Sequence, residues 1–256
     1  MLLHLKLNVT IQPLSLVSRF KTLPDPTKFL KLENVTYSWS GPSFFELKIA
    51  DLNLARSETV LLLGESGSGK STLLSLICGT IVAESGCVNV AGTDLSALSA
   101  GQRDRFRAEK IGLIFQQFNL LPFASVQDNI LLPLKFAPER RNRLRDLKLE
   151  ATRLCHDLGI HDGAMSSKAC NLSVGQQQRV AAARALIGSP PFIIADEPTS
   201  SLDAATQATF LELLFAQSRT HGTTLLMVSH DARLANQFDR VINMEDIAQT
   251  TRGAIV

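Results

Sequence analysis

Short, almost wholly apolar runs recur along this chain and alternate with segments of mixed polarity. Four of them stand out: Val60–Leu63, Ile111–Phe115, Phe192–Ala195 and Thr224–Val228. Aliphatic and aromatic runs of this length are typical of strands that are buried on both faces of a parallel sheet. The first run is followed, after a glycine-rich stretch, by the helix-prone segment Leu73–Ile77. The pattern therefore predicts an α/β fold built around a parallel sheet.

Two segments near the N-terminus have a different pattern, in which apolar and polar residues alternate. Phe29–Val35 is the first and Phe44–Leu54 the second, with Phe45, Leu47 and Ile49 on one face. Alternation with a period of two is typical of strands that have one buried and one exposed face. We therefore expect an antiparallel β subdomain at the edge of the core.

Between residues 118 and 172 the alternation of strands and helices is interrupted. Apolar residues recur at helical spacing after Ser125, and Pro133 and Pro138 divide the segment. The predicted apolar face consists of Val126, Ile130, Leu131 and Leu134. An α-helical subdomain of about residues 118–172 is therefore expected as an insertion into one domain of residues 29–250.

Residues 1–28 end in a segment with two prolines and are interpreted as an N-terminal extension joined by a linker. A disordered extension, a mobile arm and a wrongly chosen start site are all compatible with this stretch. Its first 17 residues lack the basic start and the cleavage site of a secretory signal. No apolar run in the chain approaches the ~20 residues of a membrane-spanning helix.

Composition narrows the class of protein further. The chain has 256 residues, of which 45% are hydrophobic and 20% charged, as in an ordinary globular protein. Its net charge of +2 gives no argument for nucleic acid as a partner. The four cysteines form no C-x-x-C pair, as expected of reduced thiols in a cytosolic protein.

One segment has a marked local charge. Pro138–Arg153 contains six arginines and lysines against three acids. A solvated helix face and a contact with anionic lipid headgroups are the two interpretations of this run.

The most specific pattern follows the first apolar run. Gly64-Glu65-Ser66-Gly67-Ser68-Gly69-Lys70-Ser71 fits G-x-x-x-x-G-K-[ST], the phosphate-binding loop, and Thr72 follows it. Because glycines lack Cβ atoms, the N–H groups of such a loop can turn inward around a phosphate. The helix that follows points its positive end at the same anion. Lys70 supplies a cation for the β- and γ-phosphates, and the Ser71 hydroxyl can ligate Mg²⁺.

Two acids end the third apolar run, and a histidine follows the fourth. Asp196 at the carboxyl end of a buried parallel strand is placed to hold Mg²⁺ through water. The adjacent Glu197 can accept a proton from an attacking water. His230 follows the last run and is expected to face the ligand crevice at the same edge of the sheet.

Two further positions are candidates for nucleotide contacts. Ser173 stands where an N-cap belongs, at the start of an Ala-rich helix, so that free N–H groups and a positive dipole face outward past it. Tyr37 and Trp39 are the only Tyr and Trp of the chain, and an aromatic near a nucleotide can stack on adenine. The alternative for Ser173 is that it only caps its helix. The alternative for Tyr37 and Trp39 is that they are aromatic residues of the core or the surface without a role in binding.

These residues together resemble an ABC-type ATPase domain, over about Leu30 to Ile247. The resemblance identifies Gly64–Ser71 as the Walker A motif and Leu172–Gln176 as the signature. The remaining motifs of the family are matched by Gln116 (Q-loop), Asp196 and Glu197 (Walker B with its catalytic glutamate), Ser200–Asp203 (D-loop), His230 (switch histidine) and Trp39, with Tyr37 second (the adenine-stacking aromatic).

The chain departs from the family pattern in a few places. Val174 stands in the signature where Gly is commonest. The family uses the serine hydroxyl and the later glycine amide toward the γ-phosphate, and both are present as Ser173 and Gly175, so Val174 should be tolerated. Ser57 replaces a glycine at a turn. Gln117 is adjacent to Gln116, and the spacing from the preceding strand assigns the Q-loop role to the first.

The resemblance implies a P-loop NTPase core and a head-to-tail homodimer that binds and hydrolyses ATP with Mg²⁺. One subunit would bind ATP through Trp39 and through Gly64, Glu65, Ser66, Gly67, Ser68, Gly69, Lys70, Ser71 and Thr72. The other subunit would complete the site with Ser173 and Gly175. Gln176 and Asp203 are further nucleotide-binding residues that the resemblance implies. Glu197 would polarise the water and His230 would contact the γ-phosphate. Ser71, Gln116 and Asp196 would hold Mg²⁺.

The chain has the motifs of an ATPase domain and no predicted membrane span. It is therefore expected to drive separate integral membrane permease subunits from the cytoplasmic face of the inner membrane. Phe115–Leu134 looks most like the bacterial branch that serves lipoprotein release and macrolide or peptide export. One alternative is a soluble ABC ATPase acting on DNA or ribosomes, which typically carries tandem domains, coiled-coil insertions or zinc modules. Another is a module that holds ATP without turnover, against which Glu197 and His230 argue.

Overall fold

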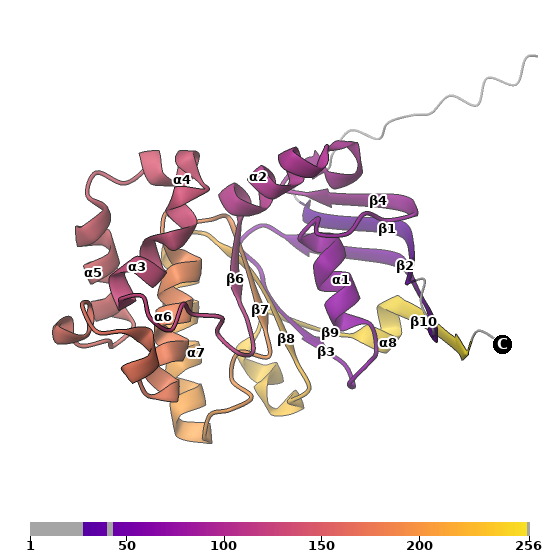
Figure 1. Cartoon of the computed structure of the whole chain (residues 1–256). Coiled ribbons are helices and arrows are strands. Elements are labelled where there is room, and N and C mark those ends of the chain that lie inside the picture. The colour runs from indigo at the N-terminus through magenta and orange to yellow at the C-terminus, as the bar shows by residue number, and fades with distance from the viewer. Residues whose placement is uncertain (1–27, 40–42, 255–256) are drawn as a thin grey trace, which may run out of the picture.

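A computed structural model describes residues 28–39 and 43–254 of the chain (Figure 1). Apart from Lys28, the predicted N-terminal extension lies outside the described residues. The described residues form two five-stranded sheets, one parallel and one antiparallel, with helices around them.

The parallel sheet contains all four of the predicted apolar runs. Its strand order is β6 (Ile111–Ile114), β7 (Phe192–Asp196), β8 (Thr224–Ser229), β3 (Thr59–Leu63) and β9 (Arg240–Asn243). Every neighbouring pair in it is parallel. The carboxyl ends of the strands therefore share one edge, where a ligand crevice is expected.

The antiparallel sheet follows from the alternating segments near the N-terminus. Its order is β10 (Ala248–Ala254), β2 (Ser43–Ala55), β1 (Lys28–Trp39), β4 (Ser85–Val90) and β5 (Thr93–Asp94). The first strand continues through Trp39, beyond the predicted end at Val35, because its pairing with β2 runs from Lys28 to Trp39. The last strand extends the sheet past residue 250, the predicted end of the domain.

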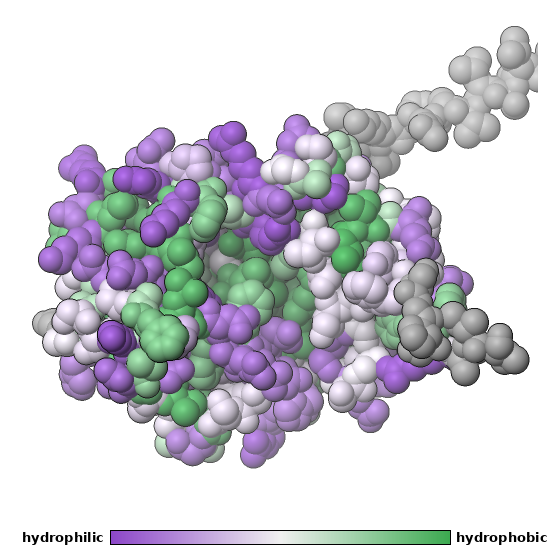
Figure 2. Space-filling view, viewed as in Figure 1, coloured by the Kyte–Doolittle hydropathy of each residue, from purple (hydrophilic) through white to green (hydrophobic). Residues whose placement is uncertain are grey.

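Alternate residues of the parallel strands belong to two different cores. Leu61 packs with the helical side of the molecule, whereas Val60 and Leu62 pack with the antiparallel sheet. Helix α1 (Lys70–Ile77) lies between the two sheets (Figure 1). Both faces of the strands are thus covered, which explains why they have continuous apolar runs. On the face shown in Figure 2, hydrophilic residues cover much of the surface.

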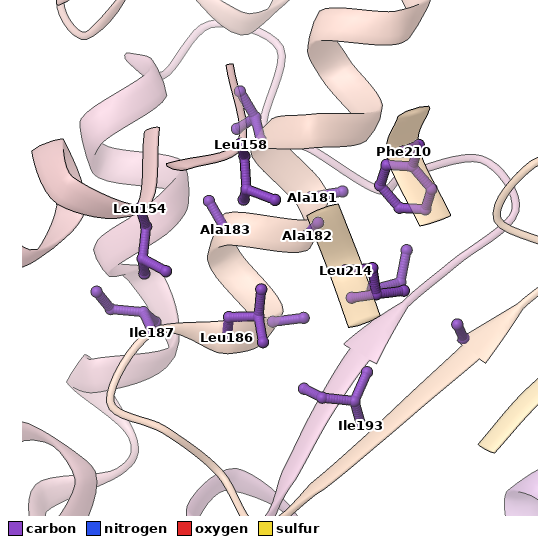
Figure 3. Packing of buried hydrophobic residues seen from close by; sticks show 14 of the residues in the cluster. Leu154, Leu158, Ala181, Ala182, Ala183, Leu186, Ile187, Ile193, Phe210 and Leu214 are labelled. Atoms are coloured by element: carbon purple, nitrogen blue, oxygen red, sulfur yellow. The ribbon is translucent and has the colours of Figure 1, made fainter. Parts of the chain in front are cut away.

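Helices α6 (Val174–Leu186) and α7 (Ala204–Thr220) cover the other face of the parallel sheet. The alanines of α6 lie between Leu154 on one side and Phe210 and Leu214 of α7 on the other (Figure 3). Small side chains allow neighbouring helices to approach α6 closely, so this helix is buried from several sides.

Residues 118–172 contain α-helices and 3₁₀-helices. These are α3 (Val126–Leu131), η2 (Leu132–Lys135), α4 (Pro138–Asn142), α5 (Leu147–Asp157), η3 (Asp162–Ala164) and η4 (Ala169–Asn171). Val126, Ile130 and Leu134 are buried. The other elements are η1 (Leu95–Ala97), α2 (Ala100–Lys110), η5 (Ala232–Gln237) and α8 (Met244–Ile247).

The basic run in this segment is not uniformly solvated. Arg141, Arg143, Arg145 and Lys148 are exposed. Arg140, in contrast, is 1% exposed and donates from Nε to the carbonyl of Ile187 at 3.1 Å. Its main-chain N–H donates to the Glu109 carboxylate at 3.0 Å. Burial lowers the pKa of Arg140 to about 10, so the guanidinium stays charged at neutral pH and ties α4 to α2 and α6.

None of the helices within residues 28–39 and 43–254 combines the length and the apolar character needed to cross a membrane.

Candidate active site

A cleft of about 390 Å³ lies at the N-terminal end of α1. Side chains and backbone from several separate elements line it: Trp39, Phe45, Ser66, Gly67, Gly69, Lys70, Ser71, Thr72, Gln116, Asp196, Glu197 and Arg252. The cleft therefore joins the antiparallel sheet, the Gly-rich loop and the carboxyl ends of the parallel strands.

The Gly-rich loop connects β3 to α1 through backbone that favours glycine. Gly69 is the N-cap of α1 and has φ 101°, in the left-handed region. A Cβ at this position would lie 2.9 Å from Cδ1 of Leu47. Gly67 has φ 79°. The backbone conformation favours glycine at both positions, and at both of them a Cβ would also lie too close to a neighbouring side chain. The spacing of the glycines in the sequence therefore follows from the shape of the loop.

Lys70 is held against the loop that precedes it. Its Nζ donates to the carbonyl oxygens of Gly64 and Glu65, each at 2.7 Å. The residue is 8% exposed and yet lines the cleft. The ammonium group is thus fixed beside the loop, where it can bind an anion in the cleft.

Trp39 is joined to the first turn of α1. Its Nε1 donates to Oγ1 of Thr72 at 3.2 Å, and the side chain is half exposed. The ring of Tyr37 packs edge-on against it, with centroids 5.2 Å apart. Tyr37 does not line the cleft. Of the two aromatics, Trp39 is the one placed to stack on a base.

Two neighbouring acids close the inner side of the cleft. Burial raises the pKa of Asp196, the negative charge of Glu197 raises it further, and Lys70 partly offsets the rise. Glu197 has φ 43°, an unusual conformation for a residue with a side chain. Its N–H donates to the carbonyl of Val228 at 3.0 Å, which holds the turn after β7. Backbone strain of this kind is common at functional sites.

Gln116 approaches the same cleft from the end of β6. Its Nε2 donates to Oγ of Ser200 at 3.5 Å, which connects this loop with the one that leads to Asp203. Gln117 is not among the residues that line the cleft. The carboxamide of Gln116 thus lies between the cleft and the loop that contains Ser200.

A second hollow of about 340 Å³ lies beside the loop and contains Gly64, Glu65, Ser68 and His230. His230 connects the two spaces, because its Nδ1 lies 3.2 Å from Oε2 of Glu197. The predicted catalytic pair is thus brought together by the ends of adjacent strands.

The remaining predicted contacts do not line either space. Ser173 caps α6, with its Oγ accepting from the N–H of Gln176 at 3.3 Å and its own N–H donating to Gln176 Oε1 at 2.9 Å. Gly175 lies in the first turn of that helix, where an added Cβ would lie 3.7 Å from Cγ2 of Thr206. Asp203 caps α7, and hydrogen bonds from Thr206 are the main reason why the pKa of its carboxyl is lowered.

Two residues that line the cleft have no counterpart in the predictions. Phe45 belongs to a correctly predicted strand, but nothing in the sequence indicates that its ring faces the Gly-rich loop. Arg252 lies on β10, a polar strand with no apolar alternation to reveal it. Only its pairing with β2 brings Arg252 to the cleft.

A comparison with protein families gives a match to the ABC transporter family over residues 47–200. This match covers more than half of the chain and extends from β2 through the Gly-rich loop to the acids after β7. The chain belongs to the ABC transporter family.

Similar proteins agree with this membership. The chain is 39% identical over 200 residues to the lipoprotein-releasing system ATP-binding protein LolD of Porphyromonas gingivalis, covering 78% of this chain and 90% of the relative. It is 41% identical over 200 residues to the macrolide export ATP-binding/permease protein MacB of Rhodopirellula baltica, covering 78% of this chain. Only 29% of MacB is covered, so the chain corresponds to less than a third of that relative.

Solved structures agree as well. The dimeric structure of the ATP-binding cassette MJ0796 in a post-hydrolysis state, bound to ADP and Pi, is similar with a TM-score of 0.74 and 35% identity. The likeness covers 84% of this chain and 93% of that one. These comparisons confirm the predicted fold class and the identification as an ATP-binding, ABC-type ATPase subunit.

Proposed function

We propose that this subunit serves an exporter of the lipoprotein-release and macrolide-export branch, as a head-to-tail dimer that drives separate integral membrane permease subunits. The observation that carries the proposal is the convergence of Lys70, Gln116, Asp196 and Glu197 on one cleft. LolD and MacB are the relatives whose names support the branch.

ATP would bind with its phosphates in the Gly-rich loop. The backbone N–H groups of residues 64–72 and the ammonium of Lys70 supply donors and charge for the β- and γ-phosphates. The half-exposed ring of Trp39, anchored through Thr72, would stack on adenine. The cleft thus offers both an aromatic ring and polar groups, which suit the base and the phosphates of a nucleotide.

The same cleft suits Mg²⁺ held together with phosphate. Ser71, Gln116 and Asp196 supply hydroxyl, amide and carboxylate oxygens, the donors that Mg²⁺ prefers. Within the described residues no group of three or more His, Cys, Asp and Glu side chains could hold a metal, so phosphate oxygens and water would complete the coordination. When bound, the ion would neutralise phosphate charge.

Hydrolysis would be assisted by the acid–imidazole pair. Glu197 lines the cleft and can accept a hydrogen bond, and then a proton, from a water facing the γ-phosphate. His230 lies 3.2 Å from the Glu197 carboxylate and would orient it while contacting the γ-phosphate. Gln116 would report the occupancy of the cleft to the helical subdomain, residues 118–172.

A second copy of the chain would complete the site. Ser173, Gly175, Gln176 and Asp203 lie at the N-terminal ends of α6 and α7 and do not line the cleft of their own subunit. Helix N-termini favour anions, so these ends suit the γ-phosphate of a facing subunit. The dimeric form of MJ0796 supports such an assembly.

The permease would dock on the other side of the chain. A mainly apolar groove of about 720 Å³ lies between α2, β6 and η2, and the exposed rings of Phe115 and Phe136 border it. Hydrophobic surface is visible between α2 and the helical segment (Figure 2). A short amphipathic segment on the cytoplasmic side of the permease fits this groove. Docking there would place the chain peripherally at the inner face of the membrane.

Lys70→Ala tests the nucleotide site. Trp39 is the only tryptophan, so its fluorescence gives a direct titration with MgATP, and released phosphate gives turnover. We expect both ATP affinity and turnover to be lost in Lys70→Ala and retained in Lys48→Ala, a change at an exposed lysine of β2. Unchanged affinity in Lys70→Ala would overturn the proposed site.

Phe136→Asp tests the docking surface. This ring is 66% exposed and lines the groove, so a charge there should abolish copurification of a membrane protein. Turnover of ATP by the isolated subunit should be unaffected. If the wild-type chain formed a fully active homodimer and no membrane protein copurified with it, this result would instead support a soluble ABC ATPase.

A further inference from the structure

The last strand brings a cation to the nucleotide cleft. In the antiparallel pairing of β10 with β2, Arg252 lies directly opposite Phe45. Directly paired residues point to the same face of a sheet. Phe45 faces the Gly-rich loop, since a Cβ on Gly69 would lie 3.4 Å from its Cζ. The register of β10 therefore directs Arg252 toward the loop as well.

Two contacts hold the guanidinium there. Its Cζ lies 5.9 Å from the centroid of the Phe45 ring, within the range of a cation–π contact. Its Nη2 donates to the carbonyl oxygen of Gly67. The absence of a side chain at Gly67 makes room for this contact, because a Cβ there would collide with Nη2.

The charge of the cleft depends on this residue. Four charged side chains line the cleft: Lys70, Arg252, Asp196 and Glu197. With all four ionised the formal charges cancel, whereas without Arg252 the lining would be net negative. A nucleotide di- or triphosphate is an anion, so its binding is favoured by the additional cation.

We propose that Arg252 is a nucleotide-binding residue of this chain, which presents its guanidinium to the phosphates as a second cation beside Lys70. The inference rests on the proposed nucleotide site. A guanidinium has five N–H donors in a planar fork, and the Gly67 carbonyl accepts from one nitrogen. The side chain is exposed at the cleft, so other donors of the fork are available to phosphate oxygens.

The test is a titration of the full chain with MgATP, followed by Trp39 fluorescence at several NaCl concentrations. We expect Arg252→Ala to raise the Kd by about tenfold at low salt, the size of one charge-assisted contact. The salt dependence of Kd should be shallower in this variant, because one fewer cation faces the phosphates. Arg252→Lys should retain part of the affinity. Thr251→Ala, which changes the neighbouring residue on the other face of the strand, should match the wild type.

Three results would overturn the proposal. An unchanged Kd in Arg252→Ala would show that the cation does not meet the nucleotide. A lower Kd would show that it covers the cleft and competes with the ligand. A loss of affinity by the same factor at every salt concentration would assign Arg252 a purely structural role. Lys70→Ala in the same titration distinguishes failure of the Arg252 proposal from failure of the proposed nucleotide site. If the nucleotide site is correct, Lys70→Ala must lose ATP binding whatever the result for Arg252→Ala.

Discussion

The Nδ1 atom of His230 lies 3.2 Å from the Oε2 atom of Glu197. The two residues are far apart in the sequence and meet because β7 and β8 are parallel neighbours, with Asp196 paired to Val228. Each of the two strands ends in a polar residue at the same edge of the sheet. The turn at Glu197 is held by its N–H bond to the Val228 carbonyl.

Glu197→Gln should separate ATP binding from hydrolysis. The amide keeps the shape of the side chain but cannot accept a proton, so turnover should fall by about a hundredfold or more. Trp39 fluorescence should still report ATP binding. The matched control is Glu212→Gln, at an exposed position of α7, which should leave turnover unchanged. Wild-type turnover in Glu197→Gln would remove this residue from the proposed mechanism.

Ser173→Ala should affect both stability and dimer formation, and the chain provides its own control. Ser99 forms a second capping box of the same type with Gln102, at the start of α2. Loss of either cap should cost about 1 kcal/mol of stability. Only Ser173→Ala should also reduce ATP-dependent dimerisation, measured by light scattering in the Glu197→Gln background. Equal dimerisation in the two variants would contradict a role for Ser173 across the interface.

Arg184→Met should disturb the loop that carries Gln116. Arg184 of α6 is 7% exposed and donates to the carbonyls of Phe118 at 2.5 Å and Asn119 at 2.6 Å. Both of these residues have positive φ, 57° and 47°. Leaving their carbonyls without the guanidinium should cost about 1–3 kcal/mol of stability, seen in urea unfolding.

The same substitution should lower turnover more than it raises the Kd for ATP, because the loop and not the phosphate site is disturbed. Arg143→Met is the control, since Arg143 also donates to main-chain carbonyls, those of Gly188 and Ser189, but at an exposed position. If both variants had the same turnover, the loop contact of Arg184 would have no functional role.

Asp196→Asn should stabilise the nucleotide-free protein at neutral pH. Burial and the charge of Glu197 raise the pKa of Asp196, so ionisation of this carboxyl opposes folding. The variant should therefore melt a few degrees higher at pH 7. Below the unfolded-state pKa of about 3.9 the wild-type carboxyl is protonated in both states, and the difference should vanish. MgATP affinity should fall in the same variant. A melting difference that persists at pH 3.5 would exclude the electrostatic cause.

Most of the core could be predicted from the sequence, because the patterns that reveal it lie within short segments of the chain. Continuous apolar runs require strands with two covered faces, and the four runs form four of the five strands of the parallel sheet. The Gly-rich loop was recognisable because only glycine suits the φ of 101° at Gly69, and because a cation and a hydroxyl must follow it. The motifs that mark the proposed site lie within such short segments.

The tertiary structure alone decided what depends on contacts between distant segments. Arg140 belongs to a strongly basic run and would be assigned to solvent, yet it is buried because main-chain carbonyls of Ala108, Ala185 and Ile187 converge on it. Arg252 reaches the nucleotide cleft only through the register of β10 on β2. The positions of these two guanidiniums could not be predicted from a sequence pattern. The groups that bind them are mainly backbone carbonyls, which every residue has whatever its side chain.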